Sequence, residues 1–406
     1  MISFLSEKRV SWFNQAAAVC LLAVWPTLTF SSVLLETFFW TSCAFCLLSL
    51  IGSRQWPILP DRLSLILIGF FFLAVLISMT VSDYPKQSFR GLIKVIRQIV
   101  IFILVFHLFQ SAGLKSNLRL VALFSFLLLL SDGAYQFFTG TDFLRGFPAQ
   151  DASSGKRLSA GLQQYGKLAA YLCTVLPLIM GWTLNAYRNP KLRQQLWYWL
   201  PLSLGGIVLL FMTRSRGAFL ALFIGLMVML ILRRAWKTIL IFVLAGALFV
   251  SILPRSMVIH LDRENKEQSL IERFELWNRA WDVIEARPLT GTGINTYAVA
   301  HQQFDKRKSW RVQNYYAHNG YLQIGAEIGL PGLFFLIFFF LRWAWIHRPQ
   351  SFEKNPETEI RWGLFVGMIS FMVACLADTA MHSLQPVMAF WFVVGLLGAF
   401  HSRPQT

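Results

Sequence analysis

The fold is decided by residues 255–318, RSMVIHLDRENKEQSLIERFELWNRAWDVIEARPLTGTGINTYAVAHQQFDKRKSWRVQNYYAH, because this is the one long stretch without the composition of a membrane span. Hydrophobic runs precede and follow it, and short connections join most of them. The 406 residues are 56% hydrophobic and only 14% charged. A helix of about 20 apolar residues spans a bilayer. The sequence therefore predicts an all-α polytopic membrane protein.

Twelve hydrophobic runs are long enough to be predicted as spans. They cover residues 13–31, 33–51, 63–81, 95–111, 118–138, 164–186, 197–213, 217–232, 237–253, 318–346, 361–380 and 384–401. Residues 1–406 are therefore expected to form a single integral membrane domain. Residues 254–317 are expected to form one long loop within it.

The distribution of Lys and Arg predicts the orientation, because short cytoplasmic loops of membrane proteins are rich in both. With the N-terminus in the cytoplasm, the inner loops hold 17 of the 37 Lys and Arg, the short outer loops hold 10, and the long loop holds 10. This excess predicts cytoplasmic termini and an outer long loop. Loop charges and anionic lipid headgroups account for much of the net charge of +17. We therefore expect membrane lipids as partners, and no nucleic acid.

The basic residues of the short outer loops are clustered, which indicates an anionic ligand on that side. Segment 82–97 contains three cations at helical spacing, Arg90 among them. Snorkelling of these side chains to the interface is the alternative explanation. Segment 139–167, which contains Arg157, is rich in Gly and Ser and is expected to form an ordered loop over the bundle.

Two arginines lie in the short connection Thr213-Arg214-Ser215-Arg216-Gly217, between hydrophobic runs. An arginine in such a place usually meets a fixed anion, and the guanidinium group suits phosphate because it donates two parallel hydrogen bonds. Arg214 and Arg216 are therefore candidate phosphate ligands. A structural salt bridge is the alternative.

The long loop contains a predicted amphipathic helix. Ser269-Leu270-Ile271-Glu272 has the pattern of a capping box, which predicts the start of a helix, and Pro288 ends it. Its apolar stripe consists of Leu270, Phe274, Trp277, Trp281 and Ile284. At about 100° per residue, Arg273 lies beside this stripe and Arg279 lies opposite. We expect the stripe to pack on the bundle or the membrane surface, with Arg279 in water.

His318 begins a run of 29 residues, 318–346. As a helix this run is about 43 Å long, whereas the hydrocarbon core is only about 30 Å thick. His318 is therefore expected at or above the outer interface, with a bend at residues 329–332. It lies between Tyr316 and Asn319, and a functional role is favoured over a structural one. Asp378 ends a later span and is expected to orient a base or pair with an arginine; solvation of the helix end is the alternative.

These residues resemble the superfamily of O-antigen ligases and O-antigen polymerases. The resemblance is close over TRSRGAFLAL (213–222), RFELWNRAWDVIEARPLTGTGINTY (273–297) and AHNGYLQIGAEIGLPGL (317–333). It is looser over YQFFTGTDFLRGFP (135–148) and KRLSAGLQQYGKLAAYL (156–172). Residues 163–166 are Gln-Gln-Tyr-Gly, where many members have a Pro-Asn pair.

The resemblance implies a membrane glycosyltransferase that takes a glycan from undecaprenyl diphosphate at the periplasmic face of the bacterial inner membrane. A ligase transfers this O-antigen donor to a sugar hydroxyl of the lipid A-core acceptor, without a metal, a cofactor or a nucleoside triphosphate. By position, the implied catalytic residues are His318, Arg216, Arg273 and Asp378. The expected substrate-binding residues are Arg214, Arg157, Arg90, Tyr316 and Asn319.

The chemistry of the residues agrees with this implication. Arginines can neutralise a diphosphate leaving group in place of a metal, and a histidine is suited to accept the proton of an attacking hydroxyl. A single displacement predicts an inverting reaction. Two other readings stay open: an O-antigen polymerase or protein O-glycosylating relative, and a transporter of lipid-linked glycans. The transporter is disfavoured because the spans contain neither a chain of acids and bases nor an inverted repeat.

Overall fold

The computed structural model describes residues 2–110, 112–150, 156–241, 244, 263–304, 316–350 and 357–401, with the side chains of 2–9, 112 and 263–270 excepted. Within this part of the chain, nine helices are long and apolar enough to cross a membrane. The chain is an all-α polytopic membrane protein, as its composition predicts.

The helices follow one another with short connections. They are α1 (Ile2–Phe30), α2 (Ser32–Ser53), α3 (Arg62–Thr80), α4 (Pro85–Leu108), α5 (Ala112–Thr139), α6 (Tyr165–Arg188), α7 (Leu196–Met212), α8 (Arg216–Leu232), α11 (Arg263–Ala286), α12 (Tyr297–Phe304), α13 (Gly320–His347), α14 (Thr358–Ala374) and α15 (Leu384–His401). Three 3₁₀ turns, η1 (Ala160–Leu162), η2 (Pro190–Gln195) and η3 (Ala380–His382), lie between them.

Eleven of the twelve predicted spans contain one of these helices, but several boundaries differ, and α1 and α5 begin at Ile2 and Ala112 rather than at residues 13 and 118. The fourth helix begins at Pro85 rather than at residue 95, because proline is well placed in a first helical turn. The eleventh, α14, ends at Ala374 rather than at residue 380, where a turn takes over. Most of the predicted span 237–253 lies outside the described residues.

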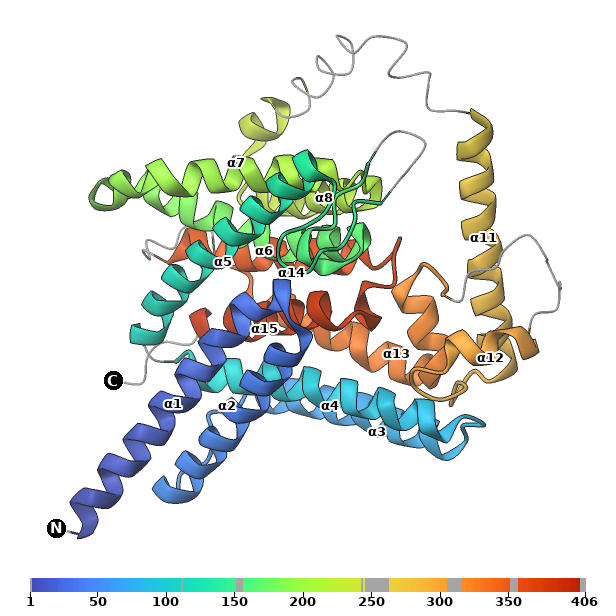
Figure 1. Cartoon of the computed structure of the whole chain (residues 1–406). Coiled ribbons are helices and arrows are strands. Elements are labelled where there is room, and N and C mark those ends of the chain that lie inside the picture. Colours follow the sequence, from blue (N-terminus) through green and yellow to red (C-terminus); the bar gives the residue numbers. More distant parts are fainter. Residues whose placement is uncertain are drawn as a thin grey trace.

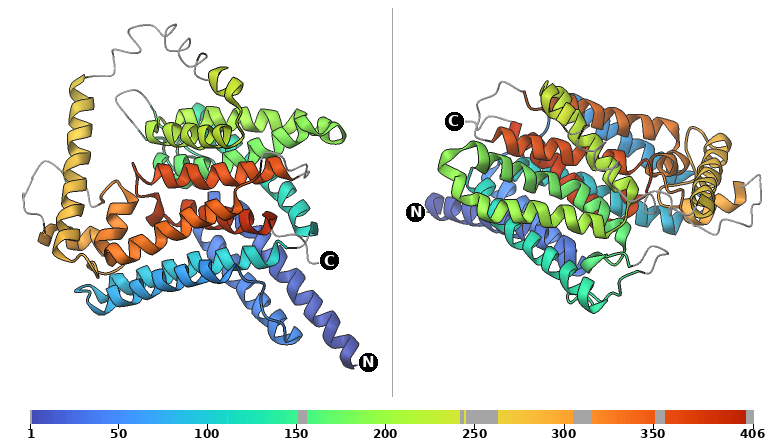
Figure 2. Two further views of the ribbon diagram at one scale, coloured as in Figure 1. Left: turned by 180° about the vertical axis from the view of Figure 1, so that it is seen from behind. Right: turned by 90° about the horizontal axis from the view of Figure 1, so that it is seen from above.

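The membrane helices form one bundle, and α11 lies across one of its ends (Figure 1). The start of α1 and the end of α15 lie at the opposite end of the bundle, as the views in Figure 2 also show. We call the first of these ends the α11 end. These two helix ends therefore lie away from α11, and the orientation in the membrane stays a prediction.

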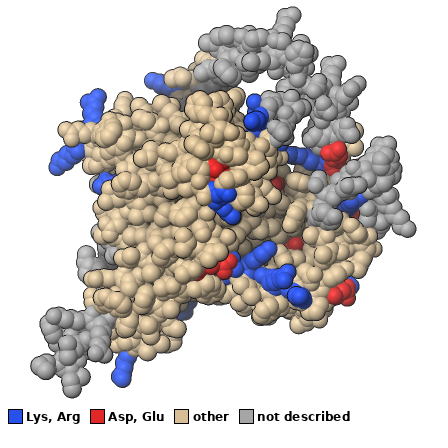
Figure 3. All heavy atoms as spheres, viewed as in Figure 1, with Lys and Arg blue, Asp and Glu red and all other residues tan. Residues whose placement is uncertain are grey.

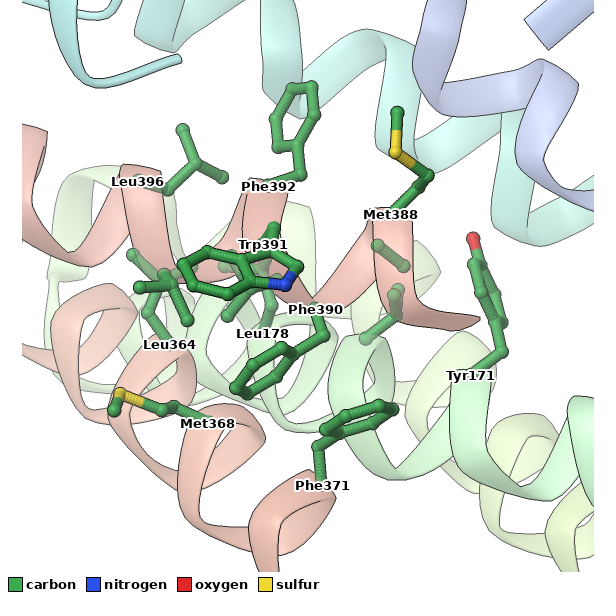
Figure 4. Close-up of a cluster of buried hydrophobic side chains, with 14 of the residues drawn as sticks. Tyr171, Leu178, Leu364, Met368, Phe371, Met388, Phe390, Trp391, Phe392 and Leu396 are labelled. Atoms are coloured by element: carbon green, nitrogen blue, oxygen red, sulfur yellow. The ribbon is translucent and has the colours of Figure 1, made fainter. Parts of the chain in front are cut away.

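The centre of the bundle is formed by α6, α14 and α15. A Cβ atom at Gly363 or Gly367 would collide with the backbone of α6, so these glycines let α14 approach α6 closely. On the other side, the rings of Phe371 and Phe390 stack with their centroids 4.3 Å apart. Figure 4 shows these two rings among the aromatic and aliphatic side chains of the three helices.

The surface of the bundle is largely apolar. Large hydrophobic side chains such as Phe70, Phe124 and Phe211 are about half exposed or more. Figure 3 shows that most of one face is uncharged and that Lys, Arg, Asp and Glu gather in a few separate groups. A membrane protein is expected to present such a surface to lipid.

Candidate active site

Three helices begin around one turn at the α11 end, residues 375–379, which we call the Asp378 turn. The backbone N–H of Gly320, at the start of α13, donates to the carbonyl oxygens of Cys375 (2.8 Å) and Asp378 (3.1 Å). A Cβ at Gly166, in the first turn of α6, would lie 3.0 Å from Oδ2 of Asp378. A Cβ at Gly217, in the first turn of α8, would lie 3.3 Å from the Cβ of Ala377. The starts of α6, α8 and α13 therefore converge here.

This convergence favours negative charge. The first turn of a helix has unpaired N–H groups and the positive end of the helix dipole. Anions, phosphate groups in particular, bind at such ends. The Asp378 carboxylate occupies part of this field, and its Oδ1 accepts a hydrogen bond from the N–H of Thr379 (2.7 Å).

His318 lies directly before α13 and is half-buried. Its backbone has a positive φ of 48°, a left-handed conformation that is uncommon for histidine. Burial lowers the pKa of His318 from its usual 6.5; the nearby Asp378 carboxylate acts against this, and the Arg273 guanidinium lowers the pKa further. The structure thus brings His318, Asp378 and Arg273 within electrostatic reach of one another. The net effect keeps the imidazole neutral near pH 7.

Asn319 fixes the start of α13. Its Oδ1 accepts hydrogen bonds from the N–H groups of Tyr321 (3.0 Å) and Leu322 (3.1 Å), which is the geometry of an N-cap. Asn319 is 8% exposed. The structure therefore gives Asn319 a structural role beside His318, and substrate binding by Asn319 stays a prediction.

The helix that carries Arg273 differs from its prediction in two respects. It begins at Arg263, so the capping-box start at Ser269 is wrong. It also packs on a different face, with Arg279 only 5% exposed, whereas Phe274 and Trp281 are 58% and 48% exposed. The prediction that Arg279 lies in water is therefore wrong. The buried face of α11 is the face that packs against α13, and the predicted apolar stripe lies only at the edge of this face.

Arg273 itself lies where the sequence places it, at the edge of the packed face, and is half-buried. Residues three, seven and ten positions further along α11, namely Leu276, Ala280 and Val283, are buried. This spacing orients one side of α11 towards the bundle. No hydrogen bond or ion pair of Arg273 is found among the residues that the structure describes.

Arg157 lies over the start of α6. Its guanidinium carbon is 4.5 Å from the ring centroid of Tyr165, the first residue of that helix. The segment is ordered, since Arg157 and Gln150 exchange backbone hydrogen bonds and the N–H of Leu158 donates to Met212 at the end of α7. The Nε atom of Arg157 is buried and has no partner in the structure. The segment 139–167 thus forms an ordered cover over this end of the bundle, as predicted, where its residues are described.

Arg214 and Arg216 lie at the junction of α7 and α8, and both side chains are exposed. The junction is held by Thr213, which is fully buried and donates to the carbonyl of Leu210 (2.6 Å). Neither arginine pairs with an acid in the described part of the chain, so the salt-bridge explanation gains no support. Arg216 is the first residue of α8, one position before the glycine that touches the Asp378 turn.

Two predicted residues are not tied to this group by any contact in the structure. Arg90 lies on α4 and is exposed. Tyr316 is 48% exposed.

One buried carboxylate holds several elements near the site together. The sequence analysis did not assign this residue to the site. Glu327, in α13, is 1% exposed. It accepts hydrogen bonds from the N–H groups of Asn295 (2.7 Å) and Tyr297 (3.3 Å), from Nε2 of Gln323 (3.3 Å), and lies 3.2 Å from Nε2 of His382. These partners belong to the segment after α11, to α13 and to η3. The sequence does contain a signal for Glu327, because it is an acid inside an apolar run and a buried carboxylate requires partners.

The bend in α13 allows this arrangement. Gly329 has a φ of 74°, so the helix is broken at the predicted place. A Cβ at Gly329 would collide with the carbonyl of Leu289, in the segment that follows α11. The N–H groups of Thr292 and Gly293 donate to the carbonyls of Ala326 and Glu327 (3.0 and 2.9 Å). The end of α11 is thereby held against α13.

A sequence model of the family described as O-antigen ligase matches residues 201–337. The matched region is about a third of the chain and is similar to this family. A search of curated proteins found no match to the chain. The matched region contains Arg214, Arg216, Arg273, Tyr316, His318 and Asn319, whereas Arg90, Arg157 and Asp378 lie outside it.

The match to the ligase family supports an O-antigen ligase or polymerase activity, and so a glycosyltransferase-like enzyme of lipopolysaccharide biosynthesis. The geometry suits that chemistry: unpaired arginines and helix N-termini attract an anion, and a neutral histidine lies beside them. Among the residues that the structure describes, no group of three or more His, Cys, Asp or Glu side chains lies together as a metal site would require. A reaction without metal stays a prediction.

Proposed function

We propose that this protein is an O-antigen ligase that transfers polysaccharide from undecaprenyl diphosphate to a sugar hydroxyl of lipid A-core. The reaction would take place at the periplasmic face of the bacterial inner membrane, with the α11 end of the bundle in the periplasm. The observation that carries the proposal is the meeting of three helix starts at the Asp378 turn, with Arg216 the first residue of α8 and His318 directly before α13. Arg216, Arg273 and His318 lie in the region matched by the ligase family model, and Arg273 and Asp378 act electrostatically on His318.

In this proposal Arg216 and Arg273 bind the diphosphate of the donor lipid. Both lack an acidic partner in the described structure, so their charge is available to an anion. Guanidinium groups bind phosphate oxygens through paired hydrogen bonds, and they stabilise the charge that develops as the diphosphate leaves. Arg214 and Arg157 are proposed as further substrate contacts.

His318 is the proposed general base. It takes the proton of the acceptor hydroxyl while the hydroxyl oxygen forms a bond to the anomeric carbon of the donor glycan. The bond between that carbon and the diphosphate oxygen breaks, and the lipid diphosphate leaves with the electron pair. Attack opposite the leaving group inverts the anomeric configuration. Asp378 stabilises the imidazolium that forms, since its carboxylate acts on His318 in the resting protein.

The lipopolysaccharide of a strain that lacks the gene tests the proposal. A ligase predicts long polymer that accumulates on the lipid carrier and never reaches the core. A core that carries a single repeat unit would instead indicate an O-antigen polymerase. Unchanged lipopolysaccharide with one glycoprotein lost would indicate the protein O-glycosylating alternative.

Orientation has its own experiment. In a background without the five native cysteines, single cysteines would replace Leu289, exposed at the α11 end, and Lys191, exposed in η2 at the other end. A membrane-impermeant thiol reagent is expected to label only the first in cells with a permeable outer membrane. Labelling of only the second would reverse the proposed orientation.

A further inference from the structure

Four cations form a ladder along one face of α4 at the α11 end. Lys86, Arg90, Lys94 and Arg97 follow one another at intervals of four, four and three residues, which places them on one side of a helix. Over 11 residues the ladder extends about 16 Å along the helix. None of its members was connected to the Asp378 turn above. The ladder therefore needs an explanation of its own.

The α1–α2 hairpin leaves space beside this ladder. Glu36, one turn into α2, makes an ion pair of 3.1 Å with Arg97. Arg97 lies 12 residues after Pro85, or about 18 Å along α4, so the tip of the hairpin meets α4 near its middle. Figure 1 shows α1 and α2 meeting near the middle of the bundle and diverging from it towards their other ends. Beyond the tip, the outer half of α4 is not covered by the hairpin.

A shallow, open groove lies along one face of α2, at its start. It has a volume of about 360 Å³ and is lined by Ser32, Val33, Glu36, Thr37 and Trp40 at the start of α2. Glu36 connects the groove directly to the ladder through Arg97.

Part of the positive charge of the ladder is available to bind an anionic ligand. Lys86 and Arg90 are exposed, and neither pairs with another residue in the described chain. Arg97 is 8% exposed, and although its Nη1 binds Glu36, its Nε is buried without a partner. Two acids act on the ladder, Glu36 on Arg97 and Glu327 on Lys94, so its four cations retain a net positive charge. A buried guanidinium with an unused donor is costly unless an acceptor arrives.

The ladder also borders the proposed active site. Nζ of Lys94 donates to Oδ1 of Asn295 (2.7 Å), in the segment after α11, and Asn295 is bound to Glu327. Lys94 and His382 line the same small cavity of about 50 Å³. A headgroup bound to the ladder would therefore lie on the side of the site that α4 forms. The junction of α7 and α8, which contains Arg216, lies with α6, α8 and α14.

We propose that the α4 ladder binds the phosphorylated headgroup of the acceptor glycolipid. The inference rests on the proposed function, because it assigns a place to the second of two lipid substrates. The donor diphosphate is compact and is already assigned to Arg216 and Arg273. The exposed pair Lys86 and Arg90 lies in the first two turns of α4, at the end of a membrane-crossing helix where lipid headgroups lie, and each cation near an anionic lipid contributes to binding.

Binding of lipid A to the purified full-length protein in neutral nanodiscs tests this proposal. The probes are diphosphorylated lipid A, dephosphorylated lipid A and phosphatidylglycerol. The variant is the double substitution Lys86→Gln and Arg90→Gln, and the matched control is Lys191→Gln and Arg193→Gln, which removes two exposed cations at the opposite end. We expect the first variant to bind diphosphorylated lipid A roughly 10-fold to 30-fold more weakly, and the control to bind it normally.

Three results would overturn the proposal. One is an equal loss for dephosphorylated lipid A, since the contact would then not involve phosphate. Another is displacement by phosphatidylglycerol at the same concentration as lipid A, which indicates a general anionic-lipid surface. The third is an unchanged affinity of the ladder variant. Binding is measured without transfer. If the protein binds lipid A at the ladder but transfers no glycan, the proposed reaction is refuted and the proposed binding site stands.

A kinetic experiment separates the two lipids. In a transfer assay, the ladder variant is expected to raise the KM for the acceptor by roughly 10-fold to 30-fold, with kcat and the KM for the donor unchanged. A raised KM for the donor alone would assign the ladder to the donor lipid and refute the acceptor site.

Discussion

The helices α6, α8 and α14 meet at both ends of the bundle, and the two ends differ in how their arginines are paired. Away from α11, Glu359 at the start of α14 bonds Arg188 at the end of α6 and Arg233 after α8, each at 2.6 Å. At the α11 end, Arg157 and Arg216 adjoin the starts of α6 and α8, and neither has an acidic partner in the described structure. At the first end, which we call the closed end, the acid and the arginines pair with one another. The second, which we call the open end, has arginines that pair with no acid in the described structure, although the Asp378 carboxylate lies at the same end.

This difference separates structural arginines from candidate ligand-binding ones. A buried acid with two arginines satisfies its own charge, and such a group fixes the packing of three helices. Arginines that converge without an acid repel one another unless an anion joins them. The same residue type in the same three helices therefore has two roles, and the partners of each arginine distinguish them.

Arg216→Ala gives the largest expected effect. Transfer should fall by about 10²–10³-fold, as when a single donor to a developing oxyanion is removed. Arg216→Lys should recover little, because an ammonium group cannot provide the paired hydrogen bonds. The thermal unfolding temperature should stay unchanged, since the side chain is exposed and unpaired. Normal activity of Arg216→Ala at normal abundance would show that the open end does not bind the diphosphate through this residue.

A pH profile tests the electrostatics of the open end. The pKa of His318 is lowered from 6.5, so its neutral form persists below that pH and activity should decline only as pH falls through the lowered value. Arg273→Gln removes a positive neighbour and should move this acidic limb to higher pH. Asp378→Asn should move it to lower pH. Shifts in the same direction for both variants, measured in the transfer assay, would contradict the arrangement.

Glu359→Gln should affect stability and leave activity nearly unchanged. The substitution leaves Arg233, whose side chain is only 12% exposed, without its carboxylate. We expect a loss of about 1–3 kcal/mol in the free energy of unfolding, less than for a fully buried pair because Arg188 is exposed. Thermal unfolding and the rate per folded molecule measure the two effects. A large loss of rate without a loss of stability would place the closed end in the mechanism.

The sequence predicts the all-α bundle and the bend at Gly329 well, because both depend on local composition. It also places His318 and Arg273 near one another, through the resemblance to the ligase superfamily. It fails at Arg279, since a helical stripe gives the apolar face but not the neighbour that α11 packs against. The partners of Glu327 could not be predicted either, because Asn295 and His382 lie 32 and 55 residues away in the chain.

The most direct test of the proposed site uses His318→Gln. Purified protein would be supplied with lipid-diphosphate-linked glycan and lipid A-core, and transfer and donor binding would be measured separately. Glutamine can hydrogen-bond but cannot take the proton, so transfer should fall by about 10²–10⁴-fold while donor binding stays normal. A variant that keeps most of the wild-type rate would contradict His318 as the base and make Asp378 the next candidate.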